Sequence, residues 1–130
     1  MTTGELGKLY ENGEYIVRQG ETGYCMYVIQ EGTVEIILEE EGEDILLAKR
    51  NTGDFFGEMA LFDRDVRSAS VRALGPARIL TIDKKNLLPR IHQDPSIAFR
   101  LLEIMSNRIR ELLLEVNRLT EITKQNKSHL

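Results

Sequence analysis

A glycine–glutamate pair and an arginine nine positions after the glutamate are the residues of this chain best suited to chemistry. Gly57 allows the backbone to approach a ligand closely, and the predicted helical turn from Glu58 to Phe62 points free N–H groups at an anion. Arg67 offers a planar set of donors that suits a phosphate. The Glu58 carboxylate can accept a hydrogen bond from a sugar hydroxyl. A phosphate on an arginine and a hydroxyl on a glutamate together indicate a nucleotide.

The residues that must position this turn form short apolar runs separated by glycine, over about residues 8–82. Such runs, rich in valine, isoleucine, tyrosine and threonine, are typical of β-strands. We expect turns at Glu31–Gly32 and Gly75–Pro76 and an acidic hairpin turn over Glu39–Asp44. About seven strands at this spacing predict an antiparallel sandwich or barrel. The expected strands cover residues 15–18, 26–29, 33–38, 45–48, 68–74 and 78–82.

The pattern changes to that of helices from Asp83 onward. A short helix is predicted over about residues 84–91, and Asp94–Pro95 stands where an N-cap and a first-turn proline begin a second helix. Apolar residues of the second helix recur at alternating spacings of four and three, which is a heptad seam. We expect the residues after about Thr123 to fray. The seam consists of Ala98, Leu102, Met105, Ile109, Leu112, Val116 and Leu119.

Composition places the chain among ordinary globular domains. It has 130 residues, of which 42% are hydrophobic and 29% charged, so one domain over residues 1–130 is expected. With 17 Lys and Arg against 21 Asp and Glu, the formal net charge is −4, which disfavours binding of nucleic acid. No apolar run approaches the roughly 20 residues of a membrane span, and no signal peptide is predicted. We therefore expect a cytoplasmic protein without a membrane segment.

Residues for a metal site or for nucleophilic catalysis are scarce. Cys25 is the single cysteine, which excludes an internal disulfide and a cysteine-based zinc site. The two histidines, His92 and His129, are far apart, and both follow the predicted strands. No Ser-His-Asp or Cys-His arrangement is indicated, so we expect neither a bound metal nor an enzyme.

The sequence around the glutamate and the arginine resembles the phosphate-binding cassette of the cyclic nucleotide-binding domain family. The family pattern is roughly F-G-E, an apolar residue and A-L, followed by a short variable stretch and R-(A/T/S)-A. The two parts stand here as Phe56–Leu61 and Arg67–Ala69. Residues 13–21 and 26–34 are similar to early strands and turns of the family. The two predicted helices occupy the place of the family's B and C helices, so the resemblance extends along most of the chain.

The resemblance implies a mainly β fold with helices at the C-terminal end. The strands would form a β-roll, a double-stranded β-helix of the jelly-roll type, over about residues 8–82. Within it, the cassette would occupy residues 56–69. The family's B and C helices would follow over about residues 83–124.

The resemblance also implies the residues that hold the ligand. Glu58 would bind the ribose 2′-hydroxyl, and Arg67 would pair with an exocyclic phosphate oxygen. Backbone N–H groups and a serine hydroxyl would complete the phosphate cradle, and apolar side chains would enclose the base. The expected contacts are Gly57, Glu58, Met59, Ala60, Arg67, Ser68 and Ala69 in the cassette, Ile36 and Leu47 beside the base, and Leu112 and Leu113 on the C helix.

The residue after the arginine bears on the choice of ligand. In the family, an alanine there accompanies cyclic AMP in many eukaryotic members, and a threonine accompanies cyclic GMP. Ser68 resembles the bacterial cyclic AMP receptor activators, so cyclic AMP is favoured and cyclic GMP remains open.

Two departures separate this sequence from those activators. They carry a helix-turn-helix after the C helix, which is missing here, so a standalone domain that does not bind DNA is expected. They also contact adenine through a Thr-Ser pair on the C helix, whereas the corresponding positions here are Leu112 and Leu113. The base would then be covered either by apolar contacts alone or by the partner helix of a dimer.

Two functional hypotheses follow. In the first, the domain senses a cyclic nucleotide and transmits binding through its C-terminal helices to an unknown effector protein or a dimer interface. In the second, it is a ligand-free protein–protein interaction module that keeps the fold. We expect the seam from Ala98 to Met105 to pack on the chain's own barrel, and the seam from Ile109 to Leu119 to pair two copies in a homodimer.

Overall fold

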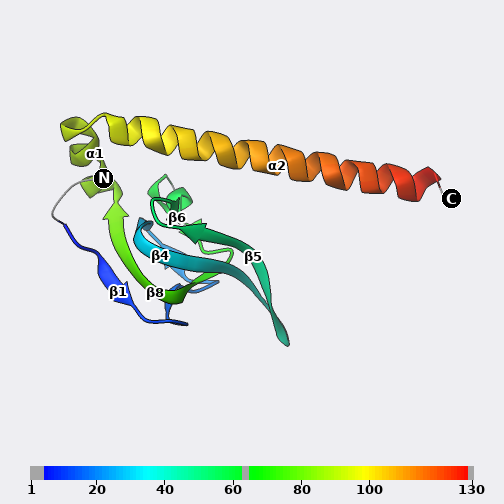
Figure 1. Ribbon diagram of the computed structural model, residues 1–130, viewed down its shortest axis with the longest axis horizontal. Helices are drawn as coiled ribbons and strands as arrows, with labels where there is room; N and C mark the ends of the chain where they lie inside the picture. Colours follow the sequence, from blue (N-terminus) through cyan, green and yellow to red (C-terminus); the bar gives the residue numbers. More distant parts are fainter. Residues whose placement is uncertain (1–4, 63–64, 129–130) are drawn as a thin grey trace. The chain divides into compact units, whose positions relative to one another are not determined.

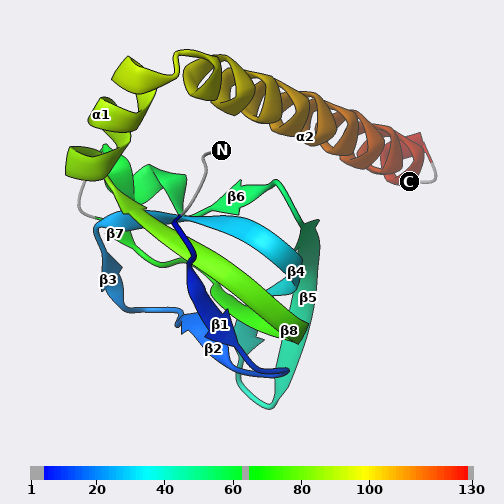
Figure 2. The same cartoon turned by 60° about the vertical axis from the view of Figure 1, so that its left-hand side comes forward.

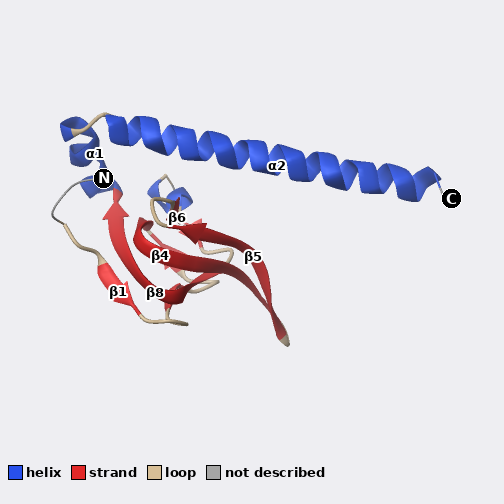
Figure 3. Ribbon diagram, viewed as in Figure 1, coloured by secondary structure: helices blue, strands red, loops and turns tan. Residues whose placement is uncertain are grey.

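Strands come first along the chain and α-helices last, as Figures 1 and 3 show. The computed structural model describes residues 5–62 and 65–128, so positions 63 and 64 of the predicted cassette lie outside the described residues. The order confirms the predicted fold class, a mainly antiparallel β structure with C-terminal helices. The elements are β1 (Lys8–Tyr10), β2 (Tyr15–Val17), β3 (Thr22–Gly23), β4 (Cys25–Glu40), β5 (Glu43–Asn51), β6 (Phe55–Phe56), the 3-10 helix η1 (Glu58–Leu61), β7 (Asp65–Val66), β8 (Ser70–Asp83), α1 (Lys84–Gln93) and α2 (Ser96–Ser128).

Two long strands form the centre of the main sheet. Its path runs β1-β8-β4-β5, while β2 pairs with β8 and β6 pairs with β4. Figure 2 shows β1 and β2 beside β8, with β5 along the other side of β4. A separate two-stranded sheet is formed by β3 and β7. Every other strand of the main sheet is therefore positioned by β4 or β8.

Both long strands are continuous, although two shorter strands were predicted in place of each. The turn predicted at Glu31–Gly32 is wrong, and so is the pairing predicted across Gly75–Pro76. Both halves of β8 pair instead with β4, from Cys25 opposite Asp83 to Ile37 opposite Ser70. The register shifts on both sides of Glu31 without ending the ladder. Glycine here marks an irregularity within a strand, not a reversal of the chain.

Gly32 lies where the two long strands approach each other closely. Its φ is +101°, in the region that favours glycine. A Cβ atom at this position would lie 2.5 Å from the Pro76 carbonyl oxygen and 2.9 Å from the Ala77 Cα atom. Both neighbouring atoms belong to the backbone of β8, so they cannot move aside as a flexible side chain could. The glycine therefore permits the pairing of β4 with β8 at the irregularity.

The hairpin of β4 and β5 follows the prediction, with one residue added. Ile36 pairs with Ala48 and Ile37 pairs with Leu46, so Leu47 is the extra residue of a bulge. The Leu47 side chain is 54% exposed. This bulge sets the direction of one of the two side chains expected beside the base.

One apolar cluster holds the sheet together and fixes β6 against β4. The rings of Tyr27 and Phe56 stack with centroids 5.1 Å apart and an interplanar angle of 16°. Ile16, Val17, Tyr27 and Ile36 pack around the cluster while partly exposed. Its buried members are Tyr10, Ile29, Val34, Phe56, Val71, Ala73, Ala77 and Ile79.

The chain divides into two compact units, Met1–Pro89 and Arg90–Leu130. In the second unit, Asp94 caps the first turn of α2, because its carboxylate accepts hydrogen bonds from both the backbone N–H and the hydroxyl of Ser96. The predicted start of this helix is thus confirmed to within a residue. The prediction of one domain over the whole chain stays a prediction.

The last turns of α2 are helical, so the fraying predicted after about Thr123 is wrong. The hydroxyls of Thr120 and Thr123 donate to the carbonyls of Val116 and Leu119, one turn earlier. A polar composition therefore does not prevent a helix from continuing. Within residues 5–62 and 65–128, no helix is both long and apolar enough to cross a membrane.

Replacing Gly32 by alanine tests the close approach of the long strands. Gly42 is a matched control, because its φ of +88° is similar and a Cβ atom there would meet nothing within 4 Å. Both Gly→Ala changes carry a backbone cost of about 1–2 kcal/mol. Gly32→Ala should lower the free energy of unfolding, measured in urea, by about 1–3 kcal/mol more. Equal losses of unfolding free energy in the two variants would show that β4 and β8 accommodate the added methyl group without further cost.

Candidate functional site

The predicted cassette begins with a sharp turn after β6. The two phenylalanines of β6 are buried and pair with Val28 and Tyr27 of β4, which fixes the start of the turn. Gly57 then adopts a φ of 76° and precedes η1. The Ala60 N–H donates to the Gly57 carbonyl at 3.3 Å, so this predicted phosphate donor already has a partner within the turn.

Arg67 is the central charged residue of the cassette, and only 6% of its surface is exposed. Its Nη1 atom donates to the Gly57 carbonyl at 3.0 Å, and its Nη2 atom donates to the Cys25 carbonyl at 2.7 Å. Among the side chains that the structure describes, no carboxylate forms an ion pair with this guanidinium. A buried charge without a counter-charge is costly. The arrangement therefore favours an anion as the missing complement.

The backbone of Arg67 is held as firmly as its side chain. Its N–H donates to the Glu21 carbonyl at 2.8 Å, and its carbonyl accepts from the Gly20 N–H at 2.8 Å. The pairing of β3 with β7 continues this ladder, with Thr22 opposite Val66 and Gly23 opposite Asp65. The segment from residue 20 to residue 23 thus runs beside the end of the cassette. Its hydrogen bonds fix the position of the Arg67 backbone, from which the side chain extends.

A polar network anchors that segment to the end of β4. The buried Ser70 hydroxyl accepts a hydrogen bond from the Gln19 N–H at 2.8 Å and donates to Glu39 Oε2 at 2.6 Å. The Gln19 side-chain amide bonds to both backbone groups of Glu39. Arg18 donates to Glu39 Oε1 at 2.8 Å. The hydrogen bond from Ser70, followed by the charge of Arg18, holds the pKa of Glu39 below its ordinary value of 4.5.

Tyr27 is an aromatic neighbour of the guanidinium. The Arg67 Cζ atom is 5.8 Å from the centre of the Tyr27 ring, a distance that allows a cation–π contact. Burial raises the pKa of the Tyr27 hydroxyl, and the positive charge of Arg67 opposes this rise. The tyrosine therefore stays protonated and offers a neutral aromatic face to the arginine.

The predicted site residues fall into three groups in the structure. Gly57 and Arg67 are in direct contact, and the rest of the cassette adjoins them in sequence, with Ala60 buried, Glu58 and Ala69 partly buried, and Met59 and Ser68 exposed. Ile36 packs against the core cluster, while Leu47 is the exposed bulge residue. Leu112 and Leu113 lie on α2 in the second unit with their side chains exposed.

Sequence reasoning missed Gly23, Tyr27 and the carbonyl of Cys25. A backbone carbonyl carries no signal in the residue type, so the role of Cys25 was not detectable. A single glycine in a strand region most often indicates a bulge or a turn, so the residue type of Gly23 does not reveal its contact with Arg67. The network of Gln19, Glu39 and Ser70 also joins residues far apart in sequence, with no motif to reveal it.

The sheet with C-terminal helices and the buried arginine give the class of fold, a mainly antiparallel β domain, and comparison with known proteins identifies the family. A family model described as a cyclic nucleotide-binding domain matches residues 8–94. The chain therefore belongs to the cyclic nucleotide-binding domain family.

The similar proteins are longer than this chain, and the match covers only part of each. A putative potassium channel protein of Rhodopseudomonas palustris is 43% identical over 109 residues, which are 82% of this chain and 26% of the relative. The cyclic AMP receptor protein of Thermus thermophilus is 32% identical over 114 residues, 87% of this chain and 53% of the relative. A cGMP-dependent protein kinase of Caenorhabditis elegans is 42% identical over 80 residues, 59% of this chain and 10% of the relative.

A solved structure extends the comparison to the fold. The crystal structure of the Thermus thermophilus catabolite activator protein has a TM-score of 0.72 and 32% sequence identity, and the match covers 87% of this chain and 54% of that one. The chain thus spans about a quarter of the first relative and about half of the second. Relatives named for cyclic AMP and for cyclic GMP both occur, so the family is settled at the level of cyclic nucleotides.

Replacing Ser70 by alanine tests the network that anchors the segment beside Arg67. The stability that Glu39 contributes is present above its ordinary pKa of 4.5 and is lost as the pH falls through its lowered folded-state pKa. Ser70→Ala removes the main cause of the lowered pKa, so unfolding free energy should depend less on pH in this acidic range. The exposed Ser68→Ala is the control and should keep the wild-type dependence. Identical pH profiles for Ser70→Ala and wild type would contradict the assigned hydrogen bond.

Proposed function

We propose that this chain is a regulatory sensor of a 3′,5′-cyclic nucleotide, with cyclic AMP as the favoured ligand, and that it is not an enzyme. The observation that carries the proposal is the Arg67 guanidinium, buried and bonded to two backbone carbonyls, with no carboxylate paired to it among the described side chains. A cyclic phosphate supplies one negative charge and acceptor oxygens, which match the remaining donors of the guanidinium.

The cassette supplies the other polar contacts in this proposal. Ser68 is exposed and follows Arg67 directly, so its hydroxyl can reach the same phosphate. The N–H groups of Met59 and Ala60 add donors, and Ala60 must share or exchange its bond to the Gly57 carbonyl. Glu58, one residue after Gly57, accepts a hydrogen bond from the ribose 2′-hydroxyl. These contacts recognise the sugar phosphate and leave the choice of base to other residues.

Apolar residues surround the base in the proposed complex. Leu47 extends from the β5 bulge with half of its surface exposed, and Ile36 lies opposite Ala48 in the same hairpin. Leu112 and Leu113 of α2 are exposed, and their contact with the base stays a prediction from the resemblance, whether they belong to the same chain or to a dimer partner. These four aliphatic side chains offer no hydrogen bond that would distinguish adenine from guanine. The preference for cyclic AMP therefore rests only on the resemblance at Ser68, and we expect modest discrimination against cyclic GMP.

Transmission of the signal follows from population shift. A ligand moves an equilibrium only by its differential affinity for two conformations. In the proposal, these conformations differ in the Gly57–Leu61 turn and in the arrangement of the C-terminal helices. The effector that responds is a partner protein or a second copy of the chain.

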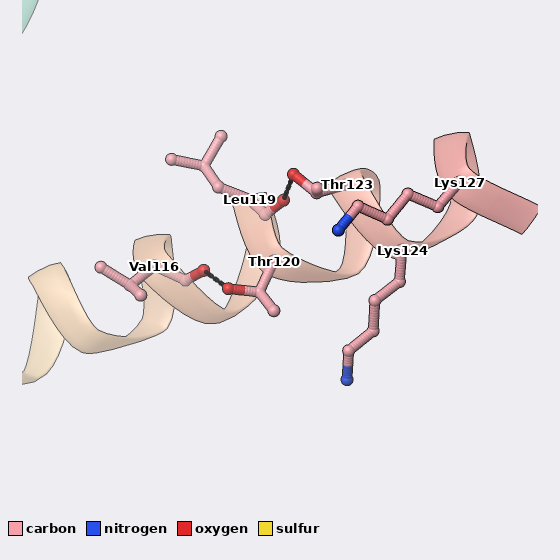
Figure 4. Close-up of a pocket in the computed structure, with 6 residues that line it drawn as sticks. All are labelled: Val116, Leu119, Thr120, Thr123, Lys124 and Lys127. Atoms are coloured by element: carbon pink, nitrogen blue, oxygen red, sulfur yellow. Dashed lines mark hydrogen bonds between the residues drawn. The ribbon is translucent and has the colours of Figure 1, made fainter.

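The seam of α2 supports the second of these possibilities, a homodimer with another copy of the chain. Ile109, Leu112, Val116 and Leu119 recur at heptad spacing, and 49–65% of each residue's surface is exposed. Figure 4 shows Val116 and Leu119 of the seam together with Thr120, Thr123, Lys124 and Lys127, the residues that line a pocket on this stretch of α2. An exposed apolar stripe of this length is costly in water unless another surface covers it. A parallel pair of α2 helices covers both seams at once.

One observation favours the second hypothesis, a ligand-free interaction module. The bonds of Arg67 to Gly57 and Cys25 give the arginine a structural use even without a ligand. An arginine kept for that purpose alone predicts no response to cyclic nucleotides. Ligand titration therefore separates the two functions.

A thermal-shift titration with cyclic AMP, cyclic GMP and linear AMP tests the sensor. A ligand at about 100 times its Kd should add about 2.7 kcal/mol of stability, which raises the Tm by several degrees. Arg67→Ala should abolish the cyclic-nucleotide shift. Arg78→Ala is the matched control, because Arg78 also donates to a backbone carbonyl, that of Gly7, outside the cassette.

The outcomes separate the two functions. A shift that survives in Arg78→Ala and disappears in Arg67→Ala supports the sensor. If Arg67→Ala does not fold, Glu58→Ala provides a second test of the cassette, since it should weaken the response to ligands that carry a 2′-hydroxyl. Wild-type protein that shows no shift with any nucleotide at millimolar concentration would favour the ligand-free module.

The dimer is tested by placing a charge in the seam. Val116→Glu should convert the dimer to a monomer, because two carboxylates would meet in an apolar interface. Asn117→Glu adds the same charge one position away from the seam and should leave the dimer intact. Sedimentation equilibrium measures the mass against the 14.9 kDa of one chain. A wild-type mass of one chain at all concentrations would exclude the proposed pairing.

A further inference from the structure

Gly23 faces the guanidinium of Arg67 and leaves no room for a side chain. A Cβ atom at this position would lie 2.3 Å from the Nε and Nη2 atoms of Arg67 and 2.4 Å from its Cζ atom. These are the three nearest heavy atoms to that Cβ position, and all belong to one side chain. Gly23 itself is buried. The Cβ atom of any other residue at position 23 would therefore overlap with the Arg67 guanidinium.

The backbone conformation does not require glycine at this position. The glycines with positive φ in the described residues include Gly20, Gly32 and Gly57, and Gly23 is not among them. An alanine could adopt the same backbone angles without strain. The nearest atoms that a larger residue would meet all belong to Arg67, which separates Gly23 from glycines that serve a turn.

The other contacts of the guanidinium complete a slot around it. Cys25, two residues after Gly23, accepts a hydrogen bond from Nη2, and Gly57 accepts one from Nη1. β3 is itself fixed by its pairing with β7, since Gly23 stands opposite Asp65. The backbone at Gly23 is therefore held by this pairing, which opposes its displacement by an added methyl group.

We propose that Gly23 is a positioning residue for phosphate binding: its missing side chain forms the slot that holds the Arg67 guanidinium toward the ligand. This inference rests on the proposed function. An alanine at position 23 would push the guanidinium away from the Cys25 and Gly57 carbonyls, while the sheet around it keeps its pairing. The charge that should meet the phosphate would then lie in the wrong place.

Gly23→Ala tests the role through ligand affinity, measured by calorimetry on folded protein with the nucleotide that wild type binds best. We expect affinity to fall at least about tenfold, because charge-assisted hydrogen bonds depend strongly on geometry. Gly42→Ala is the control, since a Cβ atom there meets nothing within 4 Å. It should bind as wild type does.

A spectroscopic measurement detects the guanidinium without a ligand. The ¹⁵N–¹H signal of the Arg67 Nε–H group, assigned by its disappearance in Arg67→Ala, should shift or vanish in Gly23→Ala. It should be unchanged in Gly42→Ala. A general loss of packing would instead alter backbone signals throughout the sheet.

A stability cycle asks whether Gly23 acts through the arginine. Gly23→Ala should destabilise the wild-type chain but cost little in an Arg67→Ala background, where the methyl group fills the vacated space. If the single variant does not fold and the double variant does, that rescue also supports the proposal. Equal destabilisation in both backgrounds would overturn it and assign Gly23 to packing of β3 alone.

The affinity results distinguish this inference from the function on which it rests. If wild type binds a cyclic nucleotide and Gly23→Ala binds it equally well, the positioning role is overturned and the sensor stands. If wild type binds none, the proposed function fails and the role of Gly23 in binding fails with it. A tenfold loss confined to Gly23→Ala, with the altered arginine signal, supports both.

Discussion

A buried arginine bonded to two backbone carbonyls is the interaction on which the rest of the site depends. Arg67 connects the first residue of β4, through the Cys25 carbonyl, to the residue that precedes η1, through the Gly57 carbonyl. These segments are far apart in sequence, and each has its own reason to be fixed: β4 is central to the sheet, and the turn follows the buried β6. The guanidinium brings a positive charge to the point where they meet.

The frame that makes this meeting possible is the long pairing of β4 with β8. Because the two strands remain paired through the irregularity at Gly32, the ladder extends from Cys25 opposite Asp83 to Ile37 opposite Ser70. Ser70 lies three residues after Arg67, and its hydroxyl receives the Gln19 N–H. The end of the ladder thus fixes the loop that holds the arginine backbone, and the start of the ladder supplies the carbonyl that holds its side chain.

The local parts of this structure could be predicted from the sequence, and the parts that join distant segments could not. The cassette turn at Gly57, the hairpin of β4 and β5 and the start of α2 all depend on residues close together in the chain. The continuous β4 and β8 were missed because Gly32 and Gly75 are ambiguous between a turn and an irregular strand, and only the partner strand decides. Gly23 was missed for a similar reason, since its role is defined by a side chain that reaches it from the far end of the cassette.

The shared carbonyl of Gly57 suggests how binding at the phosphate could alter the turn. This oxygen accepts from the Arg67 guanidinium at 3.0 Å and from the Ala60 N–H at 3.3 Å, the bond that closes η1. In the proposed function, a phosphate draws the guanidinium through its remaining donors and competes directly for the Ala60 N–H. A gain of bonds to the ligand therefore weakens the hold on the Gly57 carbonyl, and the turn and the arginine must readjust together. The ligand's differential affinity for the two arrangements limits the free energy available to act on a partner.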